Sequence, residues 1–214
     1  MKVGVVDYGV GNLGSVLQAL ESLRAQPVLL QAARDLQHVD RLILPGVGSF
    51  ADCKHLLDAG GWTAALSDAV LGRGQALLGI CLGMQLLADR GFEGTDDPEG
   101  TAGLGFIPGQ VRSLASLGCS LRVPHMGWNS IAKTAAAAPD SLLDGIPDGT
   151  DFYFVHSYAF VPASAQHLVA STDHGLPVTA VVRRGPVCGT QFHPEKSSRA
   201  GFRVLRNFLQ GPRC

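Results

Sequence analysis

Residues 77–87 of the chain read Leu-Leu-Gly-Ile-Cys-Leu-Gly-Met-Gln-Leu-Leu, which is the strongest local pattern in the sequence. An apolar run that enters Gly-x-Cys-x-Gly and continues with an apolar helical pattern is typical of a strand that turns sharply into a helix. The glycines at positions 79 and 83 leave room for this strained turn, a nucleophile elbow. The turn would present the Cys81 thiol at the C-terminal edge of a parallel sheet, beside a helix N-terminus that favours the thiolate. The motif therefore predicts an α/β fold with a cysteine nucleophile.

Two other interpretations of Cys81 are weaker. A lone cysteine in an apolar run is more often a small buried hydrophobe, but the flanking glycines favour the nucleophile. A phosphatase-type phosphate loop would need an arginine six positions after the cysteine, and Leu87 occupies that position.

The first half of the chain alternates short apolar runs with amphipathic segments, which is the pattern of parallel strands joined by helices. We predict strands over Val3–Val6, Val28–Leu30, Arg41–Leu44 and Ala76–Ile80. We predict helices over Asn12–Ala25, Phe50–Leu57 and Trp62–Leu71.

The second half has a different pattern. Residues 91–109 are rich in Gly, Asp and Pro, which favours a long ordered loop. Closely spaced strands are predicted at Gln110–Leu114, Phe152–Val155, Leu168–Ser171, Val178–Val182 and Val187–Gln191, before a final helix over Ser197–Leu209. The chain thus reads as one α/β domain, residues 1–214, with a mostly parallel central sheet flanked by helices and short antiparallel strands in its second half.

The composition is that of an ordinary globular protein. Apolar residues make up 46% of the 214 residues, charged residues 16%, and the formal net charge is −1. Such a chain lacks the excess of Lys and Arg that a broad nucleic-acid-binding surface needs. We expect no signal segment before the first strand. No apolar stretch reaches the roughly 18 residues of a membrane helix, so we also expect no membrane association.

The cysteines indicate the redox setting. Their number is five and none forms a C-x-x-C pair, which argues against a disulfide framework or a structural zinc site. We therefore expect a reduced, cytoplasmic protein. No His, Cys or Asp cluster has metal-ligand spacing, so neither a metal nor another cofactor is expected.

A thiol of ordinary acidity is only a few per cent ionised at neutral pH, so a cysteine nucleophile needs a base. Among seven histidines, His193 is the one that directly follows a predicted strand, in Gly-Thr-Gln-Phe-His-Pro-Glu at residues 189–195. Pro194 ends the strand, and Glu195 could orient the imidazole by accepting its other N–H. An isolated His-x-Glu is more often a surface pair. Behind a late strand, in a chain with a cysteine elbow, it predicts the triad Cys81, His193 and Glu195.

A second strand end runs into a glycine-rich turn at residues 44–50, Leu-Pro-Gly-Val-Gly-Ser-Phe. A phosphate cradle or a plain loop is the alternative interpretation, but the segment matches neither the Walker loop nor G-x-G-x-x-G. In a parallel sheet this strand ends at the same edge as Cys81. Backbone N–H groups of the turn would then be placed to stabilise an oxyanion.

These elements, in this order, resemble the class I glutamine amidotransferases, a triad-type family with a flavodoxin-like fold, over nearly the whole chain. The resemblance implies a glutaminase that forms a γ-glutamyl thioester on Cys81 and releases ammonia. His193 would be the general base and acid, and Glu195 its orienting carboxylate. Gln85 would help to bind the substrate glutamine. The oxyanion would be held by backbone N–H groups of three residues, Val47, Gly48 and Leu82.

Four segments resemble, more narrowly, the glutaminase subunit of imidazole glycerol phosphate synthase. They are residues 7–13 (Asp-Tyr-Gly-Val-Gly-Asn-Leu), 124–129 (Pro-His-Met-Gly-Trp-Asn), 152–158 (Phe-Tyr-Phe-Val-His-Ser-Tyr) and 191–197 (Gln-Phe-His-Pro-Glu-Lys-Ser). This resemblance implies a heterodimer with a (β/α)8-barrel cyclase. The cyclase would take up the ammonia and make imidazole glycerol phosphate and an aminoimidazole carboxamide ribotide in histidine biosynthesis.

The same resemblance implies a cyclase interface that includes Asn12, Trp128 and Lys196, with His125 beside them. A position in the core is the alternative for His125 and Trp128. A solvated surface lysine is the alternative for Lys196. His156 is expected to make a structural hydrogen bond.

Three other functions remain open from the sequence. A glutaminase that serves another synthase, such as anthranilate or aminodeoxychorismate synthase, would share the triad but lack the segments at 7–13 and 124–129. A non-catalytic regulatory module of the same fold would typically lose the cysteine or the histidine, and this chain has both. A peptidase-like cysteine hydrolase would cleave peptides or esters without glutamine.

Overall fold

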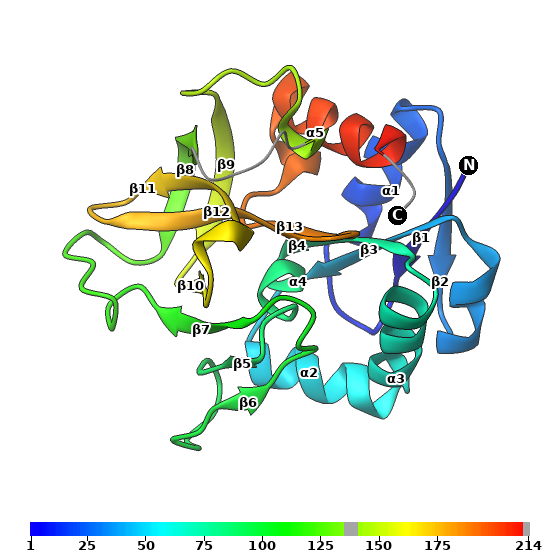
Figure 1. Ribbon diagram of the computed structural model, residues 1–214, viewed down its shortest axis with the longest axis horizontal. Helices are drawn as coiled ribbons and strands as arrows, with labels where there is room; N and C mark the ends of the chain where they lie inside the picture. Colours follow the sequence, from blue (N-terminus) through cyan, green and yellow to red (C-terminus); the bar gives the residue numbers. More distant parts are fainter. Residues whose placement is uncertain (135–140, 212–214) are drawn as a thin grey trace.

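The computed structural model of the chain describes residues 1–134 and 141–211. In this part of the chain the strands form two sheets, and the larger sheet has nine strands (Figure 1). From edge to edge these are β2 (Gln26–Leu30), β1 (Lys2–Val6), β3 (Arg41–Gly46), β4 (Ala76–Cys81), β13 (Val187–Thr190), β12 (Pro177–Arg184), β11 (Leu168–Asp173), β8 (His125–Lys133) and β9 (Asp151–His156). Pairing is parallel from β2 to β13 and antiparallel from β13 to β9. The predicted mixed sheet is therefore confirmed.

The helices lie in two layers, one on each face of the parallel strands (Figure 1). They are α1 (Leu13–Ser22), α2 (Phe50–Ala59), α3 (Trp62–Ser67), α4 (Leu82–Gln85) and α5 (Ser198–Gln210), with 3-10 turns η1 (Ala33–His38), η3 (Ser141–Leu143), η4 (Ala165–His167) and η5 (Pro194–Lys196). Successive residues of a strand point to opposite faces. Leu42 of β3 accordingly belongs to the same core cluster as Leu57 of α2, whereas Ile43 belongs to a second cluster with Leu20 of α1 and Leu205 of α5. The result is an α/β sandwich whose strand ends carry the site.

A smaller sheet lies next to α2 (Figure 1). Its order is β10 (Tyr158–Pro162), β7 (Gly109–Ser113), β5 (Arg90–Gly91) and β6 (Thr101–Ala102). The predicted loop over residues 91–109 is thus largely irregular, as expected, but it contributes short strands to this sheet.

Several boundaries differ from the predictions. Strands β8 and β10 were not predicted, because in β8 polar and apolar side chains mix without an apolar run. The helix predicted over Trp62–Leu71 is α3 followed by a π-helical turn, Asp68–Gly72. The helix after Cys81 is short, since α4 ends at Gln85.

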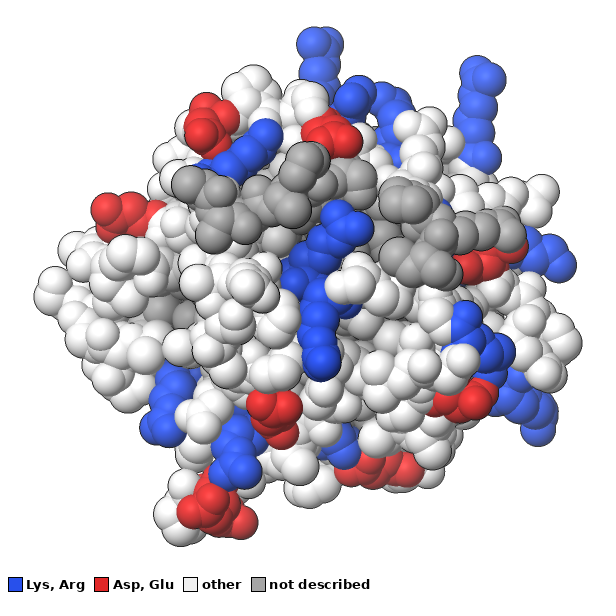
Figure 2. All heavy atoms as spheres, in the orientation of Figure 1, with Lys and Arg blue, Asp and Glu red and all other residues white. Residues whose placement is uncertain are grey.

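Charged side chains of both signs are distributed over the surface, as expected from a formal net charge of −1. Figure 2 shows acidic and basic side chains in small, interspersed groups on the face it presents. No helix in the described ranges combines the length and apolar character needed to cross a membrane.

Candidate active site

Cys81 ends β4 and stands at the turn into α4. Its backbone has φ 54° and ψ −111°, a strained conformation for a residue with a side chain. The two glycines of the motif make the turn sterically feasible. A Cβ on Gly79 would lie 2.6 Å from the carbonyl oxygen of Gly83. A Cβ on Gly83 would collide with the carbonyl oxygen of Leu44. The predicted elbow is present in the structure.

His193 and Glu195 follow β13, which runs parallel to β4 with Thr190 opposite Ile80. Both strands therefore end at the same edge of the sheet. The Nδ1 of His193 donates to Oε1 of Glu195 over 2.8 Å, and their side chains are only 4% and 1% exposed. The sequence predicted this pair, and the fold brings it to Cys81.

The charge state of His193 follows from its two neighbours. Burial disfavours the imidazolium, but hydrogen bonds to Cys81 and to Glu195, together with the charges of both groups, outweigh it and raise the pKa of His193 to about 9. At neutral pH the proton is therefore held on the imidazole. This arrangement suits a thiolate–imidazolium pair, the reactive form of a cysteine nucleophile.

A closed set of hydrogen bonds fixes the backbone of His193. Its N–H donates to the carbonyl of Tyr153 over 3.0 Å, and its own carbonyl accepts from the Ser197 hydroxyl over 2.6 Å. The same Ser197 oxygen accepts the N–H of Tyr153 over 3.0 Å. Ser197 is fully buried. Sequence reasoning gave Ser197 no role, because one serine at the start of a helix reads as an ordinary N-cap.

A cleft of about 410 Å³ opens over the thiol. It is lined by Val47, Gly48, Cys81, Leu82, Gln85, Glu93, Pro124, Val155, His156, Ser157, Tyr158 and His193. All residues predicted for the oxyanion and for substrate contact thus meet the nucleophile and the base in one place.

The glycine-rich turn after β3 lies directly beside the nucleophile, because Gly46 pairs with Cys81 in the sheet register. Two buried side chains hold its carbonyl groups. The Tyr8 hydroxyl donates to the Pro45 carbonyl over 3.0 Å, and the Cys53 thiol donates to the Val47 carbonyl over 3.2 Å. Burial raises the pKa of Cys53, so its sulfur keeps the proton that this bond needs. Cys53 was not predicted to have a role, because in the sequence it looks like an ordinary buried residue of a helix.

Gln85 contacts the cleft from the first turn after the nucleophile. Its amide nitrogen donates to the Tyr158 carbonyl over 3.0 Å and to the side-chain oxygen of Gln191 over 2.9 Å. Both amide hydrogens are thereby used within the protein, so Oε1 is the atom that Gln85 can offer to a ligand. Gln191 in turn places its amide nitrogen 3.7 Å from the Cys81 sulfur. Sequence reasoning identified Gln85 but not Gln191.

Glu93 adds an acidic side chain to the lining of the cleft. Burial raises the pKa of its carboxyl group, against a stabilising hydrogen bond from the backbone of Phe50. No sequence signal marked Glu93, because it stands among several acidic residues in the irregular segment at 91–109.

The three residues predicted at a partner interface do not line the cleft, but each lies close to the His193 segment. The Asn12 amide is 3.5 Å from Glu195 Oε1, and Lys196 directly follows Glu195 with an exposed side chain. Trp128 is 54% exposed and packs edge-on against Tyr153 at 6.2 Å.

His125 and His156 were each given an expected role from the sequence. His125 is only 4% exposed, so the expectation that it faces a partner is wrong. In the alternation along β8 its side chain points inward while Met126, 62% exposed, points outward. The structural hydrogen bond expected for His156 is confirmed, since its Nδ1 donates to the Tyr158 carbonyl over 2.8 Å.

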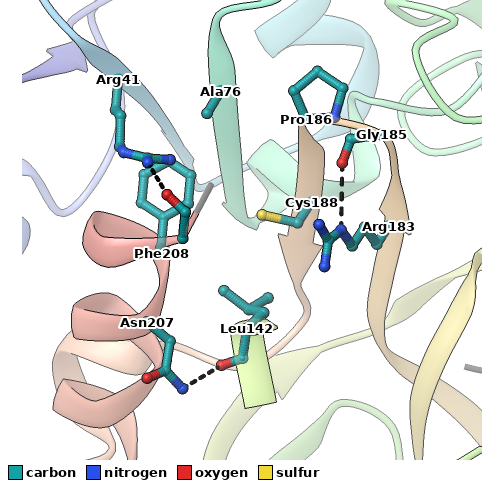
Figure 3. A pocket seen from close by; sticks show the side chains of 10 residues that line it. Arg41, Ala76, Leu142, Arg183, Gly185, Pro186, Cys188, Asn207 and Phe208 are labelled. Atoms are coloured by element: carbon teal, nitrogen blue, oxygen red, sulfur yellow. Dashed lines mark hydrogen bonds between the residues drawn. The ribbon is translucent and has the colours of Figure 1, made fainter. Parts of the chain in front are cut away.

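A second hollow lies at the opposite edge of the sheet, where β3 and β4 begin (Figure 3). Arg41 extends over the ring of Phe208 at 5.5 Å and donates to the Gly211 carbonyl, while Asn207 donates to the Leu142 carbonyl over 3.0 Å. The space is about 30 Å³, enough for about two water molecules but not for an amino acid. These contacts attach α5 to the sheet.

The site offers no metal centre within residues 1–134 and 141–211, since no group of three or more His, Cys, Asp or Glu side chains is placed to hold an ion.

The fold and this site define a class of protein. The family model of the class I glutamine amidotransferases matches residues 4–211, and the chain belongs to that family. Within it, the "Imidazole glycerol phosphate synthase subunit HisH" of Rhodospirillum rubrum is 44% identical over 98% of this chain and 99% of its own length. The HisH subunit of Brucella abortus is 43% identical over 98% and 99% of the two chains. That of Moorella thermoacetica is 44% identical over 96% and 93%.

Solved structures support the fold at much lower identity. A crystal structure described as a glutamine amidotransferase superposes with a TM-score of 0.74 at 22% identity and covers 97% of each chain. The PurLQS structure from Thermotoga maritima gives a TM-score of 0.74 at 19% identity with 97% of each chain covered. The predicted α/β amidotransferase architecture is confirmed by these likenesses.

Proposed function

We propose that this chain is the glutaminase subunit of imidazole glycerol phosphate synthase. The observation that carries the proposal is a cleft lined by Cys81 and by His193, whose Nδ1 is held by buried Glu195, in a chain 44% identical to a HisH subunit. The substrate is glutamine, the products are glutamate and ammonia, and the ammonia passes to a cyclase partner.

The chemistry follows from the positions of the three side chains. The Cys81 sulfur attacks the side-chain amide carbon of glutamine, and His193 delivers its proton to the departing ammonia. This leaves a γ-glutamyl thioester on Cys81. Water then attacks the thioester while His193 takes a proton from it, and glutamate leaves as the thiol is regenerated. Glu195 keeps the imidazole oriented through its 2.8 Å hydrogen bond.

The negative oxygen of each tetrahedral intermediate needs hydrogen-bond donors. We assign this role to the backbone N–H groups of Leu82 and of the Val47–Gly48 turn. All three residues line the cleft beside the thiol. Removal of one such donor typically costs about 3–4 kcal/mol in barrier height.

The α-amino end of the substrate is assigned to the acidic side of the cleft. Glu93 supplies a carboxylate and Gln85 has only its Oε1 left to offer, so both present acceptors to an ammonium group.

The partner is proposed to be a (β/α)8-barrel cyclase that forms a heterodimer with this chain in the cytoplasm. Asn12, Trp128 and Lys196 are assigned to its interface. Asn12 and Lys196 adjoin Glu195, and the half-exposed Trp128 packs on Tyr153, whose carbonyl accepts the His193 N–H.

The proposal is tested with Cys81→Ser in the assembled complex. We expect synthesis driven by glutamine to disappear and synthesis driven by added ammonium to remain, because the thiolate acts only in ammonia release. Glutamate release by the wild-type complex is measured in parallel. A wild-type complex that assembles but releases no glutamate would overturn the enzymatic function. Loss of both syntheses in the variant would overturn the assigned division of work between the subunits.

A further inference from the structure

A chain of polar side chains runs beneath one wall of the cleft. The Asn129 amide nitrogen lies 3.1 Å from Nε2 of His125, and Nδ1 of His125 lies 3.0 Å from Nε2 of His156. Nδ1 of His156 lies 2.8 Å from the carbonyl oxygen of Tyr158. The two histidines are only 4% and 6% exposed. None of these side chains takes part in the chemistry proposed for the triad.

The donor and acceptor of every hydrogen bond in this series follow from the group at its end, the Tyr158 carbonyl. The Tyr158 carbonyl can only accept, so Nδ1 of His156 carries a hydrogen and its Nε2 accepts. The hydrogen between the rings therefore belongs to Nδ1 of His125, which leaves Nε2 of His125 to accept from Asn129. With one neutral tautomer of His125 and one of His156, all of these hydrogen bonds can form together.

The inner end of the chain holds a wall of the cleft. The Tyr158 carbonyl that accepts from His156 also accepts from Gln85, over 3.0 Å. Residues 155–158 line the cleft, and the Val155 carbonyl lies 3.8 Å from the Cys81 sulfur. Hydrogen bonds at this one carbonyl thus connect the wall to the residue assigned to substrate binding.

The outer end of the chain is fixed to the hairpin between β11 and β12. The Asn129 amide also donates to the Asp173 carbonyl over 2.7 Å. The ring of His174 stacks on His125 with centroids 4.1 Å apart, and Phe154 stacks on the other side at 4.9 Å. His125 is therefore held in one orientation by its neighbours.

The protonation state agrees with these roles. Burial, followed by the charge of His174, lowers the pKa of His125 to about 4. Burial also lowers the pKa of His156 to about 3. Both rings are neutral at neutral pH, as an accepting Nε2 requires.

We infer that Asn129, His125 and His156 are positioning residues that hold the wall at residues 155–158 in the shape that binds the substrate. This inference rests on the proposed function, because the ligand of the cleft is taken to be glutamine. This hydrogen-bond chain acts on substrate binding and supplies no group to the chemistry proposed for the triad.

The test compares two substitutions of His125 in the complex with the cyclase. His125→Phe keeps an aromatic ring between His174 and Phe154 but removes the donor to His156. His125→Asn gives up the ring but can place an amide N–H where Nδ1–H was. His55→Asn, at an exposed site on α2, is the control. KM and kcat for glutamine and the rate of ammonium-driven synthesis are measured for each.

We expect His125→Phe to raise KM for glutamine about tenfold with kcat changed less than about threefold. His125→Asn should restore KM to within about threefold of the wild type, and the control should match the wild type. An unchanged KM in His125→Phe would overturn the inference. Equal damage in His125→Asn would also overturn it, because ring packing alone would then explain the loss.

Two further measurements keep the outcomes separate. If His125→Phe lowers the melting temperature too far for assay, Asn129→Leu removes the outer donor at a half-exposed position and should raise KM in the same direction. An unchanged KM for glutamine in a folded Asn129→Leu complex would contradict the positioning role of this series of hydrogen bonds. If the wild-type complex releases no glutamate, the proposed function fails. If it releases glutamate and the variants keep its KM, the positioning role alone fails.

Discussion

The backbone of Gly83 packs directly against the carbonyl oxygen of Leu44, so that no Cβ fits between them. This contact joins the first turn after the nucleophile to the strand that ends in the glycine-rich turn. It fixes the distance between the two sources of backbone N–H groups assigned to the oxyanion. Gly83 is therefore needed both for the elbow at Cys81 and for the close packing against the strand that leads into the glycine-rich turn.

Gly83→Ala should destabilise the chain and inactivate it together. The new methyl group meets backbone atoms that cannot rotate away, and forced overpacking of this kind costs about 1–3 kcal/mol or more. Denaturant unfolding measures the loss of stability, and glutamate release by the cyclase complex measures the activity. Gly14→Ala on α1 is the matched control, because a Cβ there meets nothing within 4 Å. It should leave activity intact and change stability by less than about 1 kcal/mol. Similar behaviour of the two variants would show that the contact at Gly83 is unimportant.

His193 should titrate far above an ordinary histidine. Its pKa is raised from 6.5 to about 9, so its interactions stabilise the folded chain fully below pH 6.5 and are lost as the pH rises toward 9. Cys81→Ala removes the largest of the raising interactions and should lower the pKa of His193. Titration of the ring protons by NMR measures both values. A wild-type His193 that titrates near 6.5 would contradict the stabilisation of its protonated ring by Cys81 and Glu195.

Much of this site was predictable from the sequence, because its parts are coded by short local patterns. Gly79 and Gly83 around Cys81 specify the elbow, and a histidine directly after a late strand specifies the base. Parallel strands end at one edge of a sheet, so these local patterns determined which groups would meet. The mostly parallel central sheet flanked by helices was predicted from the same alternation.

The residues that sequence reasoning missed act through contacts distant in the chain. Gln191 reaches Gln85 across 106 positions, and Ser197 binds the backbone of Tyr153 across 44. No local pattern records such a pairing. Strand β8 was missed for a related reason, since its inward side chains include His125, a polar residue that is buried by its partners. Glu93 became recognisable only when the fold placed it in the cleft.

Cys53 should matter to activity although it is remote from the triad in sequence. Its thiol holds the Val47 carbonyl at 3.2 Å, so Cys53→Ala frees the turn that carries assigned oxyanion donors. We expect a loss of about 0.5–1.5 kcal/mol in stability, the net value of a typical hydrogen bond, and a lower kcat for glutamine. Cys53→Ser retains a donor and should be less impaired. Ammonium-driven synthesis, measured alongside, should be equal in both variants. Equal kcat values for glutamine in the two variants would contradict the claim that the Cys53 hydrogen bond to the turn supports activity.

The acid stability of the chain should depend on its buried histidines. The pKa values of His125 and His156 are lowered from 6.5 to about 4 and about 3, so folding favours their neutral forms. The stabilisation is complete above pH 6.5 and is lost as the pH falls toward these values, by about 1.4 kcal/mol per pH unit for each ring. His125→Phe removes one of the two titrating rings, while His174, stacked on that position, remains. Denaturant unfolding at pH 7, 6 and 5 should therefore give a slope against pH that is shallower by about one proton in the variant. Carboxylates contribute equally to both proteins and cancel in the comparison. Parallel slopes would mean that His125 is protonated in the folded chain, and the direction of the hydrogen bond between the two rings would then have to be reassigned.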